Sequence, residues 1–218
     1  LKYGDKSFKK FSDFVKLLKD KFEAEKREEF IKIAPTAPIG ERVKQSWNSF
    51  IDSSLDKIIP MMMQDFCDRN NLKITTDKIL RAERLGGELD LVKRALLVHF
   101  EGYSILPDAD LIIYSNIENN VKIHCIISIE NSQNERYTRS YYWKLKLLQS
   151  KITSNIKLFM ITNYDYNRIS TIQNSKLKKE KTITEYELDG IYLIGESSNV
   201  IGKIKNANEL EDDIEKLL

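Results

Sequence analysis

The sequence predicts an α/β protein with a mixed central β-sheet flanked by helices and with a helical extension at the N-terminus. Apolar, β-branched runs separated by Asn- and Ser-rich turns recur between residues 105 and 194, and such runs are typical of buried strands. Amphipathic helical patterns fill the first third of the chain, lie between predicted strands and end the chain. This order of elements is typical of a layered α/β fold.

The composition is that of a globular protein, and its overall charge does not by itself require a nucleic-acid partner. Of 218 residues, 41% are hydrophobic and 10% aromatic, and 35 basic groups nearly balance 33 acidic ones. Cys67 and Cys125 lie far apart, which argues against a disulfide framework or a zinc site and favours a reducing cytoplasm. No run approaches the roughly 18 apolar residues of a membrane span, and the N-terminus does not resemble a signal peptide.

The first 75 residues read as a separate helical unit. Between residues 7 and 32, aromatic and aliphatic side chains recur at spacings of three and four, which predicts one amphipathic helix. The segment 34–40 contains two prolines and ends that helix. A second helix is expected over residues 40–59, interrupted by Pro60. We therefore expect a helical extension over residues 1–75 and an α/β core over residues 76–218.

Two acidic residues mark the ends of two neighbouring predicted strands. Asp108 lies at the start of the first apolar run, and Glu130 ends the second, with a polar turn over residues 115–120 between the runs. Adjacent strands lie about 5 Å apart, so these carboxylates should be close, and a divalent cation between them would offset their repulsion. Asp110 is an alternative ligand on the same strand face. Asp108 is favoured because the chain is still entering the strand there, although it could also be a simple turn residue after Pro107.

This arrangement resembles the core of the PD-(D/E)XK nucleases, and of type II restriction endonucleases in particular. The resemblance rests on Pro107-Asp108, the hairpin after it, and the strand that ends Ser128-Ile129-Glu130. The following Asn-Glu-Arg and Tyr-Trp-Lys-Leu-Lys segments are similar to the branch that cuts sites around CCGG, where Ser-x-Lys replaces (D/E)-x-K. The resemblance implies Mg²⁺ at Asp108 and Glu130, double-stranded DNA as the partner, and a homodimer whose helical extension supports dimerisation or embraces DNA.

The resemblance also implies a third acidic residue on the helix before the first strand, and Glu88 is the candidate by position. The alternative is that Glu88 only complements the dipole at the start of that helix. One feature departs from the family pattern, since no lysine follows the second-strand carboxylate. In the frame that begins at Ser128 the lysine position holds Glu130, and in the frame that begins at Glu130 it holds Ser132.

The missing lysine leaves three hypotheses open. The first is that the chain is an active endonuclease with another residue in the lysine position, as in some members of the superfamily. The second is that it is a catalytically impaired DNA-binding protein, either natural or with Glu130 substituted for the lysine. The third is that it is a structure-specific nuclease, such as a junction resolvase.

The segment after Glu130 carries the expected DNA contacts. Basic residues interleave there with tyrosine and tryptophan, and polar and cationic side chains supply both phosphate and base contacts. Arg136 is the candidate for a bidentate contact to guanine, with Glu135 orienting it or accepting from cytosine. The other expected contacts are Asn134, Arg139 and Lys144. The alternative is a cationic helix that packs its apolar stripe on the sheet and leaves its charges in water, with Arg136 or Arg139 paired with Glu130.

Overall fold

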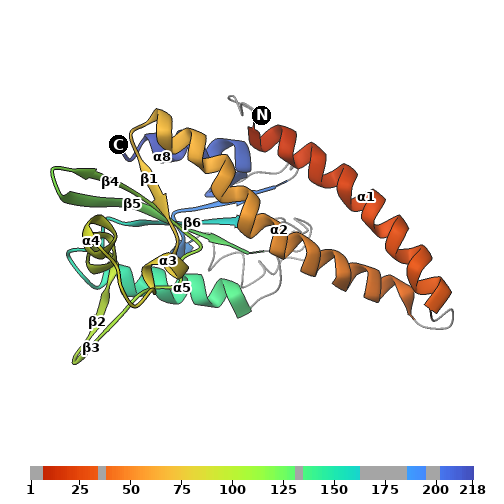
Figure 1. The fold of residues 1–218 in the computed structure, drawn as a ribbon, viewed down its shortest axis with the longest axis horizontal. Helices are drawn as coiled ribbons and strands as arrows, with labels where there is room; N and C mark the ends of the chain where they lie inside the picture. Colours follow the sequence, from red (N-terminus) through yellow and green to blue (C-terminus); the bar gives the residue numbers. More distant parts are fainter. Residues whose placement is uncertain (1–6, 34–37, 131–134, 163–185, 195–201) are drawn as a thin grey trace.

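The computed structural model describes residues 7–33, 38–130, 135–162, 186–194 and 202–218, and its centre is a six-stranded mixed sheet (Figure 1). The strand order is β1-β4-β5-β6-β7-β8. Pairing is antiparallel from β1 to β5 and parallel from β5 to β8. The strands are β1 (Lys73–Thr75), β4 (Leu111–Ile117), β5 (Asn120–Ile129), β6 (Lys157–Thr162), β7 (Gly190–Leu193) and β8 (Ile204–Asn206). The predicted fold class is confirmed.

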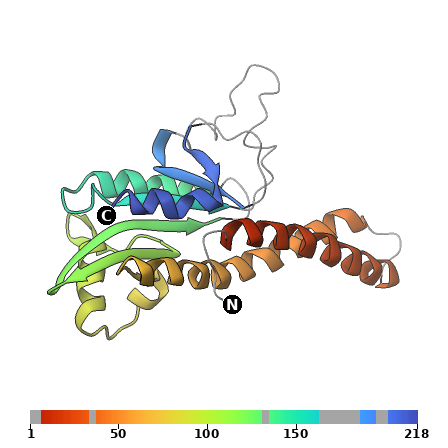
Figure 2. The same cartoon turned by 90° about the horizontal axis from the view of Figure 1, so that it is seen from above.

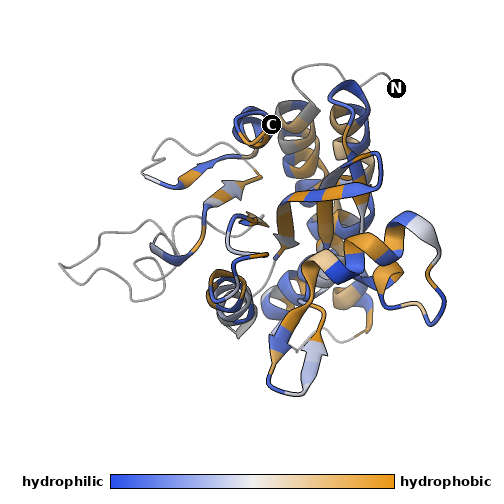
Figure 3. Ribbon diagram, turned by 90° about the vertical axis from the view of Figure 1, so that its left-hand side faces the viewer, coloured by the Kyte–Doolittle hydropathy of each residue, from blue (hydrophilic) through white to orange (hydrophobic). Residues whose placement is uncertain are grey.

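Helices cover both faces of the sheet because alternate strand residues point to opposite sides. One face, which includes Leu111 and Ile113, shares a core with α1 (Ser7–Ile33), α2 (Ile39–Arg69) and α8 (Leu210–Glu215). The other face, which includes Ile112, packs against α4 (Gly87–Leu96) and α5 (Glu135–Leu148). Figure 3 shows the resulting pattern, with largely hydrophobic strands between helices banded by hydrophilic and hydrophobic residues.

β4 and β5 form the hairpin that positions the candidate site. The two-residue turn Glu118-Asn119 has positive φ at both positions, 53° and 64°, which matches the twist that a short hairpin requires. Leu111 pairs with Ile127, so the residues just before β4 and those just after β5 lie at the same end of the sheet. The predicted pairing of neighbouring strands is confirmed. The helix expected between the second and third strands predicts that these two are parallel, and β5 and β6 are paired in parallel.

The two N-terminal helices lie side by side and extend beyond the sheet (Figures 1 and 2). The prediction that Pro60 interrupts the second helix is wrong, because α2 runs through Pro60 for 31 residues. Burial of Ile59, Met62 and Met63 in the core supports the helix on both sides of the proline, whereas Met61 is 67% exposed. The division into units at residue 75 stays a prediction, although α1 and α2 pack against the sheet itself.

Several short elements escaped the sequence prediction. They are β1, β8, the 3₁₀ turn Ala207–Glu209 and the separate hairpin of β2 (Val98–Phe100) with β3 (Tyr103–Ile105), which projects from the body in Figures 1 and 3. The sequence predicts a short helix over residues 76–84, and the structure has α3 (Asp77–Leu80), capped by Thr76, whose Oγ1 accepts from the N–H of Ile79. The sequence also predicts a loop at residues 163–167 and a basic surface run at residues 176–181, and both segments lie outside the described residues. No helix in the described part of the chain is long and apolar enough to cross a membrane.

Candidate active site

A polar pocket of about 270 Å³ lies where β4 begins and β5 ends. Five elements or their flanking residues contribute to it: α2, α3, α5, β4 and β5. Its acidic lining residues are Asp56, Asp77, Asp108, Asp110 and Glu130, and its basic ones, among the described residues, are Lys78 and Arg139. The predicted pair, Asp108 and Glu130, therefore lines one pocket, together with Ser128.

Asp108 is already surrounded by cationic and N–H donors. Arg81, just after α3, donates to its Oδ1 at 2.8 Å, and the Trp143 indole donates to its Oδ2 at 3.3 Å. The Arg139 Nε lies 3.8 Å from Oδ2. The Asp108 side chain is 45% exposed, so it is open to solvent as expected. Its negative charge is balanced by protein groups, which makes it a weaker candidate for a metal ligand than its neighbour Asp110.

Asp110 directly precedes β4 and is partly buried. Its Oδ2 accepts a hydrogen bond of 2.7 Å from the backbone N–H of Ile129. Burial, above all, raises the pKa of Asp110 to about 6, and the charges of Asp56 and Asp77 act in the same direction. The Ile129 N–H and the charge of Lys78 oppose that rise. Asp110 thus holds a poorly compensated negative charge at the pocket wall.

Glu130 continues β5 by one residue, since its N–H donates to the Ile161 carbonyl at 2.8 Å. Only 7% of the residue is exposed. Ser128, two residues earlier on the same strand face, donates its hydroxyl to Glu130 Oε1 at 3.1 Å. Asp110 and Glu130 are therefore two partly or fully buried carboxylates on adjacent strand ends, joined through the backbone at Ile129.

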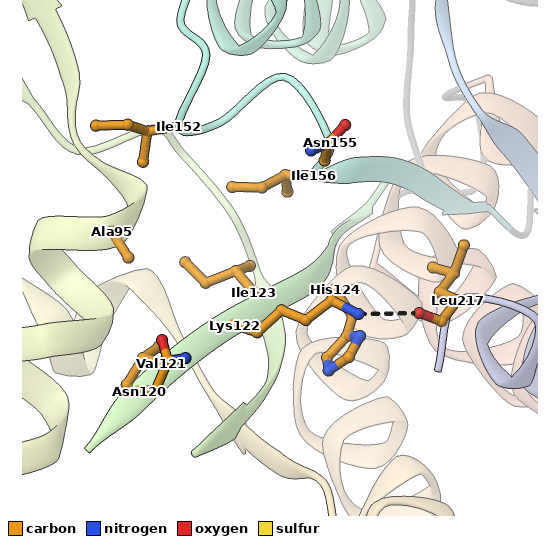
Figure 4. A pocket seen from close by; sticks show the side chains of 10 residues that line it. All are labelled: Ala95, Asn120, Val121, Lys122, Ile123, His124, Ile152, Asn155, Ile156 and Leu217. Atoms are coloured by element: carbon orange, nitrogen blue, oxygen red, sulfur yellow. Dashed lines mark hydrogen bonds between the residues drawn. The ribbon is translucent and has the colours of Figure 1, made fainter. Parts of the chain in front are cut away.

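A larger pocket of about 580 Å³ lies at the opposite end of β5 (Figure 4). Figure 4 shows Ile123, Ile152 and Ile156 around the same space, and Lys122 donates to the Leu217 carbonyl at 3.4 Å. None of the described residues that line it is acidic. The smaller, acidic pocket is therefore the better candidate for chemistry.

Glu88 does not line the acidic pocket. Its carboxylate accepts from Lys73 at 2.6 Å, Tyr114 at 2.8 Å and Asn116 at 2.8 Å, at the far part of β4. The hydrogen bond from Lys73, with those from Asn116 and Tyr114, lowers the pKa of Glu88 to about 2. These contacts give Glu88 a structural role at the start of α4 and do not bring it near Asp108 or Glu130.

Lys144 is also placed differently from the prediction of an exposed DNA contact. The residue is 4% exposed, its amine lies 2.6 Å from Asp189 Oδ2, and it donates to the Ile156 carbonyl. Lys144 therefore ties α5 to the start of β6 and β7 and is not available to DNA. Arg139, by contrast, is 62% exposed beside the pocket.

The remaining predicted contacts are only partly covered by the structure. Ser132 and Asn134 lie outside the described residues. Glu135 and Arg136 begin α5, which starts just beyond the acidic pocket, and only their backbone is described. Their roles stay predictions.

Sequence reasoning missed Asp56, Asp77 and Lys78 at this pocket. Asp56 comes from α2, far away in sequence, and nothing in its helical pattern singled it out. Asp77 and Lys78 lie in a short helix whose sequence carries no recognisable motif. Asp110 was found from the sequence as the alternative ligand, because it lies two residues beyond Asp108 on the same strand face. Among the described residues, no group of three or more acidic, His or Cys side chains is close enough to hold a metal ion by itself.

An acidic pocket at the end of an antiparallel strand pair, within a mixed sheet flanked by helices, is consistent with a nuclease of the expected class. The family model described as BsaWI restriction endonuclease type 2 matches residues 88–214, which is more than half of the chain. The chain belongs to this family of type II restriction endonucleases.

Two relatives are similar over most of their length. "Probable type II restriction enzyme HpyAORF263P" of Helicobacter pylori is 47% identical over 161 residues, 74% of this chain and 75% of the relative. "Putative type II restriction enzyme MjaVIP" of Methanocaldococcus jannaschii is 41% identical over 174 residues, 79% of this chain and 77% of the relative. The expected resemblance to type II restriction enzymes is confirmed.

Two solved structures are similar at 13% sequence identity and a TM-score of 0.47 each. One is the pre-specific BsaWI–DNA complex, with 87% of this chain and 70% of that chain covered. The other is the PspGI–substrate DNA complex, with 95% and 80% covered.

Proposed function

We propose that this chain is a Mg²⁺-dependent endonuclease that cuts double-stranded DNA at a short palindromic site, with Asp110 and Glu130 as the metal ligands. The observation that carries the proposal is the hydrogen bond from the Ile129 N–H to Asp110, which brings these two carboxylates to one pocket. Membership in a family of type II restriction endonucleases supports the reaction.

The chemistry of the pocket fits Mg²⁺. Magnesium takes oxygen ligands and is commonly bound by one or two carboxylates together with substrate phosphates and water. Asp110 and Glu130 supply the carboxylates, and the raised pKa of Asp110 is the sign of a negative charge that a cation would stabilise. Mg²⁺ in such a site lowers the pKa of a coordinated water and offsets charge on the scissile phosphate.

Asp108 has a different role in this proposal from the one expected. With Arg81 and Arg139 it forms a charged cluster at the rim of the pocket, and the two arginine side chains are 45% and 62% exposed. Asp108 orients the two arginines so that they can contact the DNA backbone next to the scissile bond. Arg139 thereby keeps its expected role as a DNA contact.

The recognition element is the start of α5, beside the pocket. Asn134, Glu135 and Arg136 are the residues proposed to contact base edges, with Arg136 on guanine. The chain would act as a homodimer whose two-fold axis matches that of a palindromic site, each subunit cutting one strand. The extended pair α1–α2 is the proposed support for dimerisation or for holding DNA.

The experiment is digestion of plasmid DNA by the purified protein with Mg²⁺, followed by sequencing of the ends. We expect discrete fragments that share a short palindrome, related to CCGG, and no cutting when EDTA removes the metal. Sedimentation of the free and DNA-bound protein would check the dimer. Random degradation, or cutting that EDTA does not stop, would contradict the proposal.

A second candidate is a DNA-binding protein that has lost cleavage, because Glu130 stands where the family pattern has lysine. Specific DNA binding without cutting under Mg²⁺ or Mn²⁺ would select it. Cutting by the Glu130→Lys variant but not by the present chain would identify an inactivated enzyme.

A further inference from the structure

The acidic pocket contains a lysine that no motif predicts. The family pattern expects a cation two residues after Ser128, and Glu130 occupies that position. Among the described residues that line the pocket, only Lys78 and Arg139 carry positive charge. These two are the candidates, among the described residues, for the cation that hydrolysis of a phosphodiester would use in this pocket, and the inference drawn here rests on the function proposed above.

Arg139 belongs to the cluster around Asp108. Its Nε lies 3.8 Å from Asp108 Oδ2, and Arg81 joins the same carboxylate. Lys78 makes an ion pair of similar length with another residue of the pocket. Its amine lies 3.9 Å from Asp56 Oδ2, and 78% of its side chain is exposed, against 62% for Arg139. A lysine on a flexible four-carbon stem with a weak partner can turn toward a phosphate that enters the pocket.

The backbone beneath Lys78 is anchored next to Asp110. The Asp77 N–H donates to the carbonyl of Ala109 at 3.2 Å, and Thr76 caps the same helical turn. Lys78 therefore follows a residue that is hydrogen-bonded to the immediate neighbour of Asp110.

We propose that Lys78 is the catalytic cation of this pocket and takes the place of the lysine missing at position 130. Its ammonium donates hydrogen bonds to the attacking water and to a non-bridging oxygen of the scissile phosphate, and it stays protonated. The water oxygen forms a bond to phosphorus, and one P–O ester bond breaks with its electron pair leaving on the departing oxygen. One water proton ends on that oxygen, and the other goes to the new phosphate terminus or to solvent.

The test measures single-turnover cleavage and DNA affinity for the present chain and for Lys78→Gln. We expect the cleavage rate of Lys78→Gln at saturating DNA to fall on the order of 100-fold, as for loss of one donor to a developing negative charge. DNA affinity should change only a few-fold. Lys78→Arg, which keeps the charge, should recover part of the rate. Lys57→Gln removes an exposed lysine of α2 that does not line the pocket and is the matched control.

A variant at position 130 separates failure of this inference from failure of the proposed function. If Lys78 supplies the cation, the present chain cuts and Glu130→Lys cuts no faster. Unchanged cleavage in Lys78→Gln would overturn the role of Lys78, as would weaker DNA binding with an unchanged rate at saturation. If only Glu130→Lys cuts, the inference about Lys78 and the proposed ligand role of Glu130 both fail, and the pocket is that of an inactivated nuclease. If neither cuts, the proposed function fails with it.

Discussion

The backbone N–H of Ile129 donates a hydrogen bond of 2.7 Å to the carboxylate of Asp110. This contact joins the residue before β4 to the last residue of β5, immediately before Glu130. Because β4 and β5 are antiparallel, the two acidic residues leave the sheet at the same end. The hydrogen bond thereby holds the Asp110 carboxylate at the end of β5, where Asp110 and Glu130 line the same pocket.

Asp110→Asn should abolish most of the cleavage without unfolding the protein. The asparagine can still accept from the Ile129 N–H, but it loses the charge that binds a cation. We expect the cleavage rate to fall on the order of 100-fold or more, since a metal contributes several kcal/mol to transition-state stabilisation. Asp108→Asn, the matched variant two residues earlier, should have a smaller effect, measured on the same DNA. A larger loss in Asp108→Asn would return the ligand role to Asp108.

Cleavage should weaken as the pH falls through about 6. Burial raises the pKa of Asp110 to about 6, so the carboxylate is ionised above this pH and protonated below it. Only the ionised form binds Mg²⁺, and protons compete with the metal, so more Mg²⁺ should move the midpoint of the rate profile to lower pH. The rate of cleavage measured between pH 5 and 8 at two Mg²⁺ concentrations checks this. A midpoint that does not respond to Mg²⁺ would speak against Asp110 as a ligand.

Glu88→Gln should affect stability and not metal-dependent cleavage. The pKa of Glu88 in the folded chain, about 2, lies below the ordinary value of 4.5, so its ionised form stabilises the fold above pH 4.5. This contribution is lost as the pH falls from about 4.5 to about 2. Urea unfolding should show a loss of about 1–2 kcal/mol at pH 7 and a smaller one at pH 3, after allowance for partial exposure. Loss of Mg²⁺ dependence in this variant would reinstate Glu88 at the site.

Lys144→Met should destabilise the fold, because the amine of Lys144 is buried against Asp189. Removal of one partner of a buried ion pair costs about 3 kcal/mol or more, although Lys157, 3.3 Å from Asp189, offsets part of that cost. Urea unfolding measures the effect. Lys151→Met, at an exposed position just after α5, should change the stability by no more than about 0.5 kcal/mol. Equal stability of the two variants, with weaker DNA binding only for Lys144→Met, would restore the expected DNA contact.

The sheet was predictable because its strands are long apolar runs, as in β4, β5 and β6, and their turns are rich in Asn and Ser. The continuous α2 was not predictable, because proline removes a hydrogen bond inside a helix, and the burial of residues on both sides of it, such as Ile59, Met62 and Met63, is a tertiary effect. The short strands β1 and β8 are three residues each, too short for a periodic pattern.

The candidate site was predictable to within a few residues. The predicted pairing of the two strands was enough to place Asp108 and Asp110 close to Glu130, and all three line one pocket. The choice between Asp108 and Asp110 depended on Arg81 and the Ile129 N–H, which are tertiary contacts that no local pattern contains. The burial of Lys144 also depends on a tertiary contact. The parallel pairing of β6 with β7 brings Asp189, just before β7, to the Lys144 amine, and no local pattern around Lys144 contains that partner.

Whether Asp110 and Glu130 bind the metal can be seen in an anomalous-difference map from crystals of the protein bound to DNA in the presence of Mn²⁺. We expect an anomalous peak between the carboxylates of Asp110 and Glu130, next to a DNA phosphate. A peak ligated by Asp108 and Glu88 instead, or no peak in the acidic pocket although DNA is bound there, would contradict this ligand role.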